Sequence, residues 1–396
     1  MYSEKMYELG SKKSTIRTIF EYGKEREKIV GAENIYDFSL GNPNVPAPEF
    51  IKQAIFDILN EEEPYEVHGY TVAAGDPKVR EILAESINER FGTSFGMQNL
   101  FMTAGAAASI TICFKALAEA GDEFITFAPF FPEYQCFVES VGCELKVVPA
   151  DIDTFQIHFE KFEQMLSKHT KAVIINSPNN PSGVVYSEET IKKLSEILAK
   201  KSEEYGHPIF IISDEPYREL VYDGVEVPYV TKYYANTLVC YSYSKSFSLP
   251  GERIGYIVIP GEVTEFQCVY AAIAGAARVL THVNAPSLFQ KAVARCAGKP
   301  SDISIYEKNR GLLYQGLTDV GFTCVKPQGA FYLFPRSLEE DDRAFCEKAK
   351  AYDLLLVPGS DFGCPGHFRA SYCIKTSTIE RSLPVFKKFA KEVYGI

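Results

Sequence analysis

One stretch of the chain reads Ser242-Tyr243-Ser244-Lys245 and continues, after residues 246–248, as Leu249-Pro250-Gly251-Glu252-Arg253-Ile254-Gly255. A lysine amine can condense with an aldehyde to form a Schiff base. A serine hydroxyl and the planar guanidinium of Arg253 are suited to hold a phosphate group. The stretch therefore predicts a site for a cofactor that carries both an aldehyde and a phosphate, with Lys245 as its covalent anchor.

Short apolar runs alternate with amphipathic stretches through the middle of the chain. Their near-continuous hydrophobicity is typical of strands that are buried on both faces. The pattern predicts an α/β fold with a mostly parallel central sheet, whose ligands bind at the carboxyl ends of the strands. The expected strands are Asn99–Thr103, Glu123–Phe127, Leu145–Val148, Ala172–Asn176, Ile209–Ser213, Leu238–Tyr241 and Ile254–Ile259, and the expected helices include Ala107–Glu119, Phe131–Val141 and Ser187–Tyr205.

The pattern changes after about residue 285, which predicts a second domain. Strand-like Ala330–Phe334 and Phe368–Ile374 flank a helical Asp341–Tyr352. We expect the N-terminal helix Thr15–Val30 and the extended Phe38–Pro48 to pack with them. The sequence thus predicts a large cofactor domain at residues 46–285 and a smaller α+β domain built from both termini, residues 1–45 plus 286–396.

Composition limits the classes of partner. A formal net charge of -11 argues against nucleic acid, because phosphate backbones require a basic surface. No apolar run of about 18 residues and no signal-peptide pattern are visible, so we expect no membrane contact. Ten cysteines without a CxxC pair predict free thiols in a reducing cytoplasm. Cys364-Pro365-Gly366-His367 has no second half, so no metal site is expected.

Two further segments after predicted strands suit a planar, phosphorylated ligand. Thr103–Ser109 enters a helix with only small side chains at the turn, which lets backbone N–H groups approach an anion. Ala128–Tyr134 offers an aromatic ring for stacking on a planar ligand. A tight turn and a core aromatic residue remain the alternative interpretations.

Three more segments supply polar groups. Asn176–Gly183 is a proline-restricted loop in which an asparagine amide can donate, while Asp214 ends a buried strand, where its carboxylate needs a cation such as a protonated ring nitrogen. Tyr217 follows three residues later, and Arg369 offers a bidentate receptor for a carboxylate. Each of these also fits a turn, a helix cap or a surface arginine when taken alone. Their occurrence together at strand ends indicates one shared site.

These residues together resemble the fold-type I pyridoxal-phosphate enzymes, and in particular the class I/II aminotransferases similar to aspartate aminotransferase. The resemblance extends from Ser39-Leu40-Gly41-Asn42-Pro43 to Phe368-Arg369-Ala370-Ser371. It implies pyridoxal 5'-phosphate (PLP) as the cofactor. It also implies a ping-pong transfer of an amino group from an L-amino acid, with aspartate a candidate, to a 2-oxo acid.

The resemblance also implies a role for each matching residue. Lys245 forms the Schiff base and moves the Cα proton, and Asp214 pairs with the pyridine nitrogen. Asn180 and Tyr217 bind the ring oxygen, and Phe131 stacks on the ring, with Phe130 the next choice. The phosphate is held by Gly105, Ala106, Ser242 and Arg253, and Tyr70 reaches it across a homodimer interface. The substrate is bound by Gly41, Asn180 and Arg369. Arg278 is the candidate that would bind a second, distal carboxylate of the substrate.

Some features leave the reaction type open. Leu249-Pro250-Gly251 also occurs in relatives that resemble cystathionine β-lyase, so a PLP-dependent C–S β-lyase is the alternative. Ser242-x-x-Lys245 fits the nucleophile motif of β-lactamases, but no Ser-Asp-Asn occurs and Lys375-Thr376 is followed by Ser377. A non-catalytic cofactor-binding regulator is disfavoured by the presence of Lys245.

Overall fold

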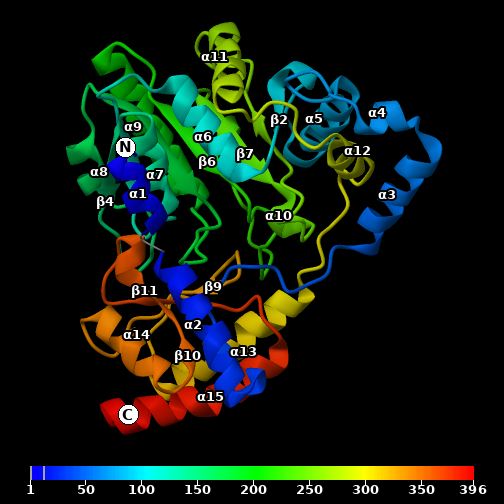
Figure 1. The fold of residues 1–396 in the computed structure, drawn as a ribbon. Coiled ribbons are helices and arrows are strands. Elements are labelled where there is room, and N and C mark those ends of the chain that lie inside the picture. The colour runs from blue at the N-terminus through cyan, green and yellow to red at the C-terminus, as the bar shows by residue number, and fades with distance from the viewer. Residues whose placement is uncertain (1, 12–13) are drawn as a thin grey trace.

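A seven-stranded sheet forms the centre of the larger of two units in the computed structural model, which describes residues 2–11 and 14–396 (Figure 1). Its order is β2 (Leu100–Thr103), β8 (Gly255–Val258), β7 (Thr237–Ser242), β6 (Phe210–Asp214), β5 (Thr170–Asn176), β3 (Glu123–Phe127) and β4 (Glu144–Val148). The strands from β7 to β4 are parallel, and β8 runs opposite to the other six strands of this sheet. The predicted mostly parallel sheet is confirmed.

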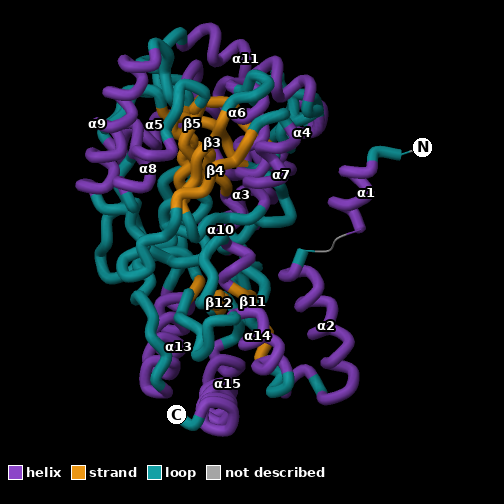
Figure 2. Tube along the Cα trace, turned by 90° about the vertical axis from the view of Figure 1, so that its left-hand side faces the viewer, coloured by secondary structure: helices purple, strands orange, loops and turns teal. Residues whose placement is uncertain are grey.

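Helices cover both faces of this sheet (Figure 2). On one side, α6 (Ala106–Leu117), α7 (Glu133–Ser140) and α11 (Phe266–Val279) share an apolar core with the strands. On the other side lie α8 (Phe159–Met165) and α9 (Glu188–Tyr205). Ser187 caps α9 as the sequence predicts, because its hydroxyl accepts from the Thr190 N–H. The prediction of α7 from Phe131 onward is too long, since Pro132 occupies its N-cap.

The smaller unit combines short strands with long helices. β1 (Tyr36–Asp37) pairs in parallel with β10 (Leu354–Leu355), so the N-terminal segment lies beside the C-terminal part of the chain. β9 (Tyr332–Leu333), β12 (Phe368–Ser371) and β11 (Val357–Pro358) form an antiparallel sheet. β9 and β12 are shorter than the predicted strands Ala330–Phe334 and Phe368–Ile374. Ala330 lies outside β9 because its φ of 56° is not that of an extended strand. The surrounding helices are α2 (Thr15–Val30), α13 (Ser304–Val320), α14 (Asp342–Lys350) and α15 (Thr376–Phe389).

The remaining helices are short or flank the sheet. They are α1 (Glu4–Ser11), α3 (Glu49–Glu61), α4 (Pro64–His68), α5 (Pro77–Phe91), α10 (Tyr243–Ser246) and α12 (Ser287–Arg295), with short turns of other helix types at Ala32–Asn34, Met97–Asn99, Val230–Lys232, Gly359–Phe362 and Ala390–Tyr394. The predicted domain division stays a prediction. Helix α12, which that division assigns to the smaller domain, shares an apolar core with α3 and α5 of the larger unit. None of the helices within the described residues has the length and apolarity needed to cross a membrane.

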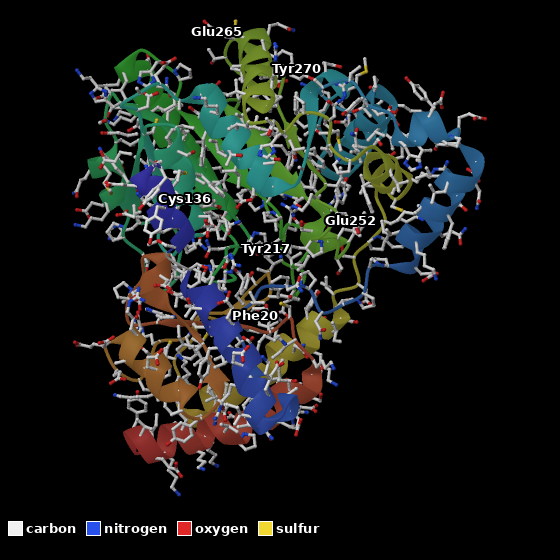
Figure 3. All side chains as sticks on the ribbon, viewed as in Figure 1. Phe20, Cys136, Tyr217, Glu252, Glu265 and Tyr270 are labelled. Carbon is white, nitrogen blue, oxygen red and sulfur yellow. The ribbon has the colours of Figure 1, made fainter. Side chains whose placement is uncertain are left out.

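The carboxyl ends of β5, β6 and β7 meet the start of α6 at the edge of the larger unit that faces the smaller one. Helix α10 follows β7 directly and lies between the two units in Figure 1, and Tyr217, after β6, lies at the same junction in Figure 3. The topology therefore collects the predicted site residues in one place, as expected for ligands of parallel sheets.

Candidate active site

A cavity of about 300 Å³ lies at this junction. Most of the residues that the sequence predicts for the cofactor and the substrate line it. They are Gly41, Ala106, Phe131, Asn180, Asp214, Tyr217, Ser242, Lys245, Arg253 and Arg369.

Lys245 projects from the short helix α10, whose N-cap is Ser242. Its Nζ donates a hydrogen bond to the Gly41 carbonyl oxygen at 2.7 Å. Burial lowers the pKa of Lys245 from 10.5 to about 8, with smaller lowering contributions from Arg369 and Arg253, against the opposing effect of Cys373. About a tenth of this amine is therefore unprotonated at pH 7 and about half at pH 8, and the unprotonated form is the nucleophile toward an aldehyde.

Asp214 is held at the end of β6 by two neighbours. The Tyr134 hydroxyl donates to Oδ2 at 2.5 Å, and Asn176 Nδ2 donates to the Asp214 carbonyl at 2.9 Å and to Oδ2 at 3.4 Å. Burial raises the pKa of Asp214 to about 7, the Tyr134 hydrogen bond lowers it, and the charge of Glu215 raises it.

The other carboxylate oxygen of Asp214 has no hydrogen-bond partner, although it is buried. A buried acceptor without a donor is costly, and a protonated ring nitrogen would satisfy it. The cavity therefore fits the pyridine ring of PLP, because the nitrogen of that ring would give Asp214 Oδ1 the donor that it lacks.

The start of α6 forms an anion-binding turn. Its N-cap, Gly105, has a φ of 89° and offers no side-chain cap, so the first backbone N–H groups of the helix are left for a ligand. A Cβ atom on Gly105 would lie 2.9 Å from Arg253 Nη2, so glycine is needed where the guanidinium approaches the turn. Ser242 and Ser244 lie beside it, with their hydroxyl oxygens 2.8 Å apart. The donor set suits a phosphate.

The two candidate stacking residues lie in different surroundings. Phe131 lines the cavity, and its ring makes an edge contact with Tyr134 at 5.6 Å. Phe130 is instead buried against the loop at Gly363, where an added Cβ would lie 2.7 Å from its ring. The geometry therefore favours the first choice.

Arg369 enters the cavity from β12 of the smaller unit. Its Nη1 donates to Asn180 Oδ1 at 3.0 Å, and its Nη2 donates to the Ser39 carbonyl. Nε has no partner, so three of its five N–H groups remain for a ligand. Since Asn180 Oδ1 accepts from Arg369, the Asn180 amide group is left as a donor. The pair can bind a carboxylate and a neighbouring oxygen together.

Tyr70 and Arg278 lie outside this cavity. Tyr70 is 96% exposed and lines a separate surface cavity of about 990 Å³, and Arg278 is an exposed residue of α11. Any role for either residue at the Lys245 site requires a second subunit.

Sequence reasoning missed Tyr134, which donates to Asp214 without lining the cavity, and several residues that do line it. Tyr134 follows Phe131 by three residues and could have been identified as a helical neighbour. The hydroxyl of Tyr332 lies 2.9 Å from that of Tyr217, and no sequence pattern near Tyr332 indicates that it lines the site. The other unpredicted lining residues are Ile16, Ala107, Ile110, Asn176, Pro216, Ser244 and Pro250.

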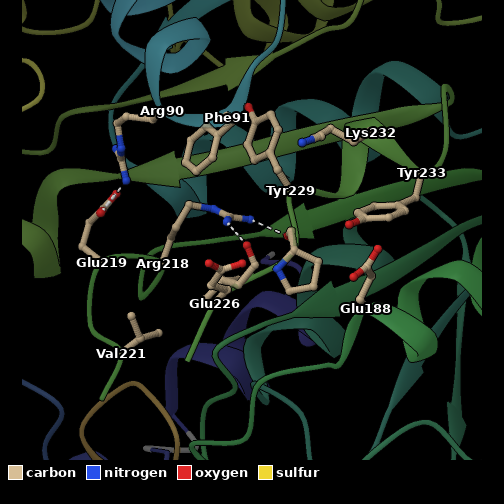
Figure 4. Close-up of a pocket in the computed structure, with 12 residues that line it drawn as sticks. Arg90, Phe91, Glu188, Arg218, Glu219, Val221, Glu226, Tyr229, Lys232 and Tyr233 are labelled. Atoms are coloured by element: carbon tan, nitrogen blue, oxygen red, sulfur yellow. Dashed lines mark hydrogen bonds and ion pairs between the residues drawn. The ribbon is translucent and has the colours of Figure 1, made fainter. Parts of the chain in front are cut away.

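A further cavity of about 480 Å³ is lined by Arg90 and Phe91 at the end of α5 and by residues of the segment 218–233 (Figure 4). Its arginines are already paired. Arg90 binds Glu219 at 2.6 Å, and Arg218 forms a buried ion pair with Glu215 and donates to the carbonyl oxygens of Val227 and Pro228. These contacts support the loop that follows Asp214. The described residues contain no group of three or more His, Cys, Asp or Glu side chains that could hold a metal ion.

The chain resembles known proteins along nearly its whole length. The pattern that defines "Aminotransferase class I and II" matches residues 28–385. A probable aspartate/prephenate aminotransferase of Aquifex aeolicus is 29% identical over 394 residues, covering 93% of this chain and 94% of that protein. An aspartate aminotransferase of Geobacillus stearothermophilus is also 29% identical, over 92% of this chain and 94% of the relative.

Solved structures agree with these relatives. An amino transferase from Eubacterium rectale is 57% identical with a TM-score of 0.98, covering 100% of this chain and 99% of that one. Aspartate aminotransferase from Thermus thermophilus with maleate is 25% identical with a TM-score of 0.85, over 98% and 100% of the two chains. No observation favours the C–S β-lyase alternative. The chain belongs to the class I and II aminotransferases and is a fold-type I, PLP-dependent aminotransferase.

Proposed function

We propose that the enzyme moves the amino group of an L-amino acid, with L-aspartate the first candidate, to a 2-oxo acid through Lys245. The unpaired, buried Oδ1 of Asp214 in the cavity that contains the Lys245 amine is the observation that carries this proposal. Bound PLP supplies an electron-poor ring that absorbs the charge left when a Cα proton is removed. The proposal for aspartate is supported by the names of the relatives.

Lys245 is suited to both of its proposed tasks. Its lowered pKa leaves Nζ able to attack an aldehyde and, once it is free again, to accept the Cα proton and return it. The Gly41 carbonyl, which accepts from Nζ, orients the amine before it reacts. Asp214 keeps a proton on the ring nitrogen by supplying the anionic partner.

Arg369 and Asn180 orient the substrate in this proposal. The free N–H groups of Arg369 bind the α-carboxylate in two-pronged fashion, and the Asn180 amide donates to the ring oxygen with Tyr217. Gly41 lines the substrate side, where a larger residue would meet Tyr332. Gly105, Ala106, Ser242 and Arg253 hold the phosphate, and Phe131 stacks on the ring.

We propose a homodimer in which Tyr70 reaches the phosphate of the partner's site. The surface around Tyr70 exposes several large apolar side chains, including Tyr65 at 87% and Val72 at 55%. Such a patch on an otherwise charged protein favours an interface. Arg278 would meet a distal carboxylate in the same way. Cysteines without a disulfide among the described residues support the proposed cytoplasmic location.

The half-reaction tests the proposed chemistry. Purified protein is loaded with PLP and titrated separately with L-aspartate, L-alanine and L-cystathionine while its near-visible spectrum is recorded. Conversion of the cofactor band by one donor, and its return with a 2-oxo acid, supports the proposal and identifies the donor. Lys245→Ala should give neither change. Release of pyruvate from L-cystathionine without an acceptor would instead support the lyase.

Mixing two inactive variants tests the shared site. Tyr70→Ala and Lys245→Ala proteins are dissociated and reassociated together. Part of the activity should return, since one of the two sites in a mixed dimer would be intact. Mixtures as inactive as the separate variants would contradict a shared site.

A further inference from the structure

Tyr332 connects three groups of the active site that come from different parts of the chain. It lies on β9 of the smaller unit and is only 2% exposed. Its hydroxyl oxygen lies 2.9 Å from that of Tyr217, which follows β6 of the larger unit. Both residues line the cavity, so this pair of phenols bridges the two units at the site.

The same hydroxyl limits the chain at Gly41. A Cβ atom on Gly41 would overlap the Tyr332 hydroxyl, so the two are compatible only because residue 41 has no side chain. The Gly41 carbonyl in turn accepts the hydrogen bond from Lys245 Nζ at 2.7 Å. Tyr332 therefore fixes the approach of the backbone segment that orients the lysine amine.

The ring of Tyr332 supports Arg369. The guanidinium carbon lies 4.7 Å from the centre of the Tyr332 ring and 4.9 Å from that of Phe362. A guanidinium in contact with two aromatic rings has fewer orientations open to it, so its N–H groups point in set directions. The hydroxyl and the ring of Tyr332 thus serve different neighbours.

We propose that Tyr332 is a positioning residue with two roles. Its hydroxyl donates to the Tyr217 hydroxyl, so that Tyr217 donates to the ring oxygen of PLP. The aromatic ring of Tyr332 orients Arg369 for the substrate carboxylate. The inference rests on the proposed roles of Tyr217 and Arg369. A phenol that accepts one hydrogen bond is a stronger donor in the next, because hydrogen bonds in a chain polarise one another. The chain of two phenols therefore stabilises an ionised ring oxygen more than Tyr217 does alone.

Removing only the hydroxyl tests the first half of the proposal. Tyr332→Phe weakens the donor to the ring oxygen, so the protonated form of the bound cofactor persists to higher pH. The midpoint of the pH-dependent absorption change of PLP-loaded protein should rise by about half a unit. Tyr222→Phe is the matched control. It removes a buried hydroxyl of the same apolar core, which donates to the Ala330 carbonyl, and it should leave the midpoint of the absorption change where it is in wild type.

Removing the ring tests the second half. Tyr332→Leu leaves Arg369 with one aromatic neighbour, and KM for the amino donor should rise about tenfold above that of Tyr332→Phe. Equal KM values in the two variants would overturn the role of the ring.

A double substitution decides whether Tyr332 acts through Tyr217. The spectral shift from Tyr332→Phe should disappear in a Tyr217→Phe background, and a shift that persists there would overturn the proposal. If Tyr217→Phe itself leaves the midpoint unchanged, the contact of Tyr217 with the ring oxygen is wrong and the inference falls with it. Continued amino transfer in that variant would show that the proposed function nevertheless stands.

Discussion

The buried carboxylate of Asp214 should make the PLP-free protein less stable as the pH rises. Burial raises the pKa of Asp214 from 3.8 to about 7, so the folded chain holds this proton more tightly than the unfolded chain does. The stabilising contribution is complete below pH 3.8 and is lost as the pH rises from there to about 7. The full difference corresponds to about 4 kcal/mol, of which about 3 kcal/mol falls between pH 5 and pH 8.

Asp214→Asn removes this dependence while keeping an oxygen that can accept from Tyr134. The free energy of unfolding of PLP-free protein is measured by urea denaturation at pH 5 and pH 8 for both proteins, so that other titrating groups cancel in the difference. Wild type should lose about 2 to 3 kcal/mol more than Asp214→Asn between the two pH values. Adding PLP should flatten the wild-type dependence, because a protonated ring nitrogen then neutralises the carboxylate.

The result that refutes this reasoning is equal pH dependence in the two PLP-free proteins. It would mean that Asp214 Oδ1 already has a partner when the cofactor is absent, and the fit of the cavity to a pyridine ring would lose its main support.

Three further predictions concern other parts of the site. The rate at which PLP-free protein captures PLP, followed by absorbance, should increase with pH and reach half its maximum near pH 8, because the pKa of Lys245 is lowered by burial; a midpoint near the 10.5 of an ordinary lysine would contradict this. Arg369→Lys should raise KM for the amino donor by about 10- to 100-fold with little change in PLP affinity, since lysine cannot make the two-pronged contact. Tyr134→Phe should weaken PLP binding about tenfold in an equilibrium titration, since loss of a hydrogen bond to a charged group raises the pKa of Asp214 further; unchanged affinity would assign Tyr134 a packing role only.

The sheet could be predicted from the sequence because its strands are buried on both faces. Runs such as Ile209–Ile212 are apolar at consecutive positions, and the ends of each predicted strand lie within two residues of the observed ends. The short strands of the smaller unit are less predictable. β9 includes only two residues, and its boundary depends on the backbone conformation of Ala330, which no hydrophobic pattern encodes.

The site was predictable where chemistry is carried by residues next to strand ends. Asp214 is the last residue of a buried strand, and Lys245 and Asn180 lie a few residues after two others, so the fold alone brings them together. Tyr332 and Ile16 could not be found in this way. They reach the cavity from the smaller unit and from α2, and their neighbours are determined by how the two units pack.

The charges around the cavity limit what it can bind. Lys245, Arg253 and Arg369 are the cationic residues among those described as lining it, and Asp214 is the anionic one. In the proposed function, Lys245 reacts with the aldehyde as a neutral amine, so the charges of Arg253 and Arg369 would be used by the phosphate and the α-carboxylate, and that of Asp214 by the ring nitrogen. A substrate with one carboxylate therefore uses every charge that one chain supplies, whereas the second carboxylate of L-aspartate would enter a cavity with no cation left for it, at a high desolvation cost. The rates of amino transfer from L-aspartate and from L-alanine, measured in wild type and in Arg278→Ala, decide whether the partner subunit supplies the missing cation. If Arg278→Ala loses activity with L-aspartate alone, the partner supplies it. If both proteins prefer L-alanine, the charges of one chain alone determine the amino donor.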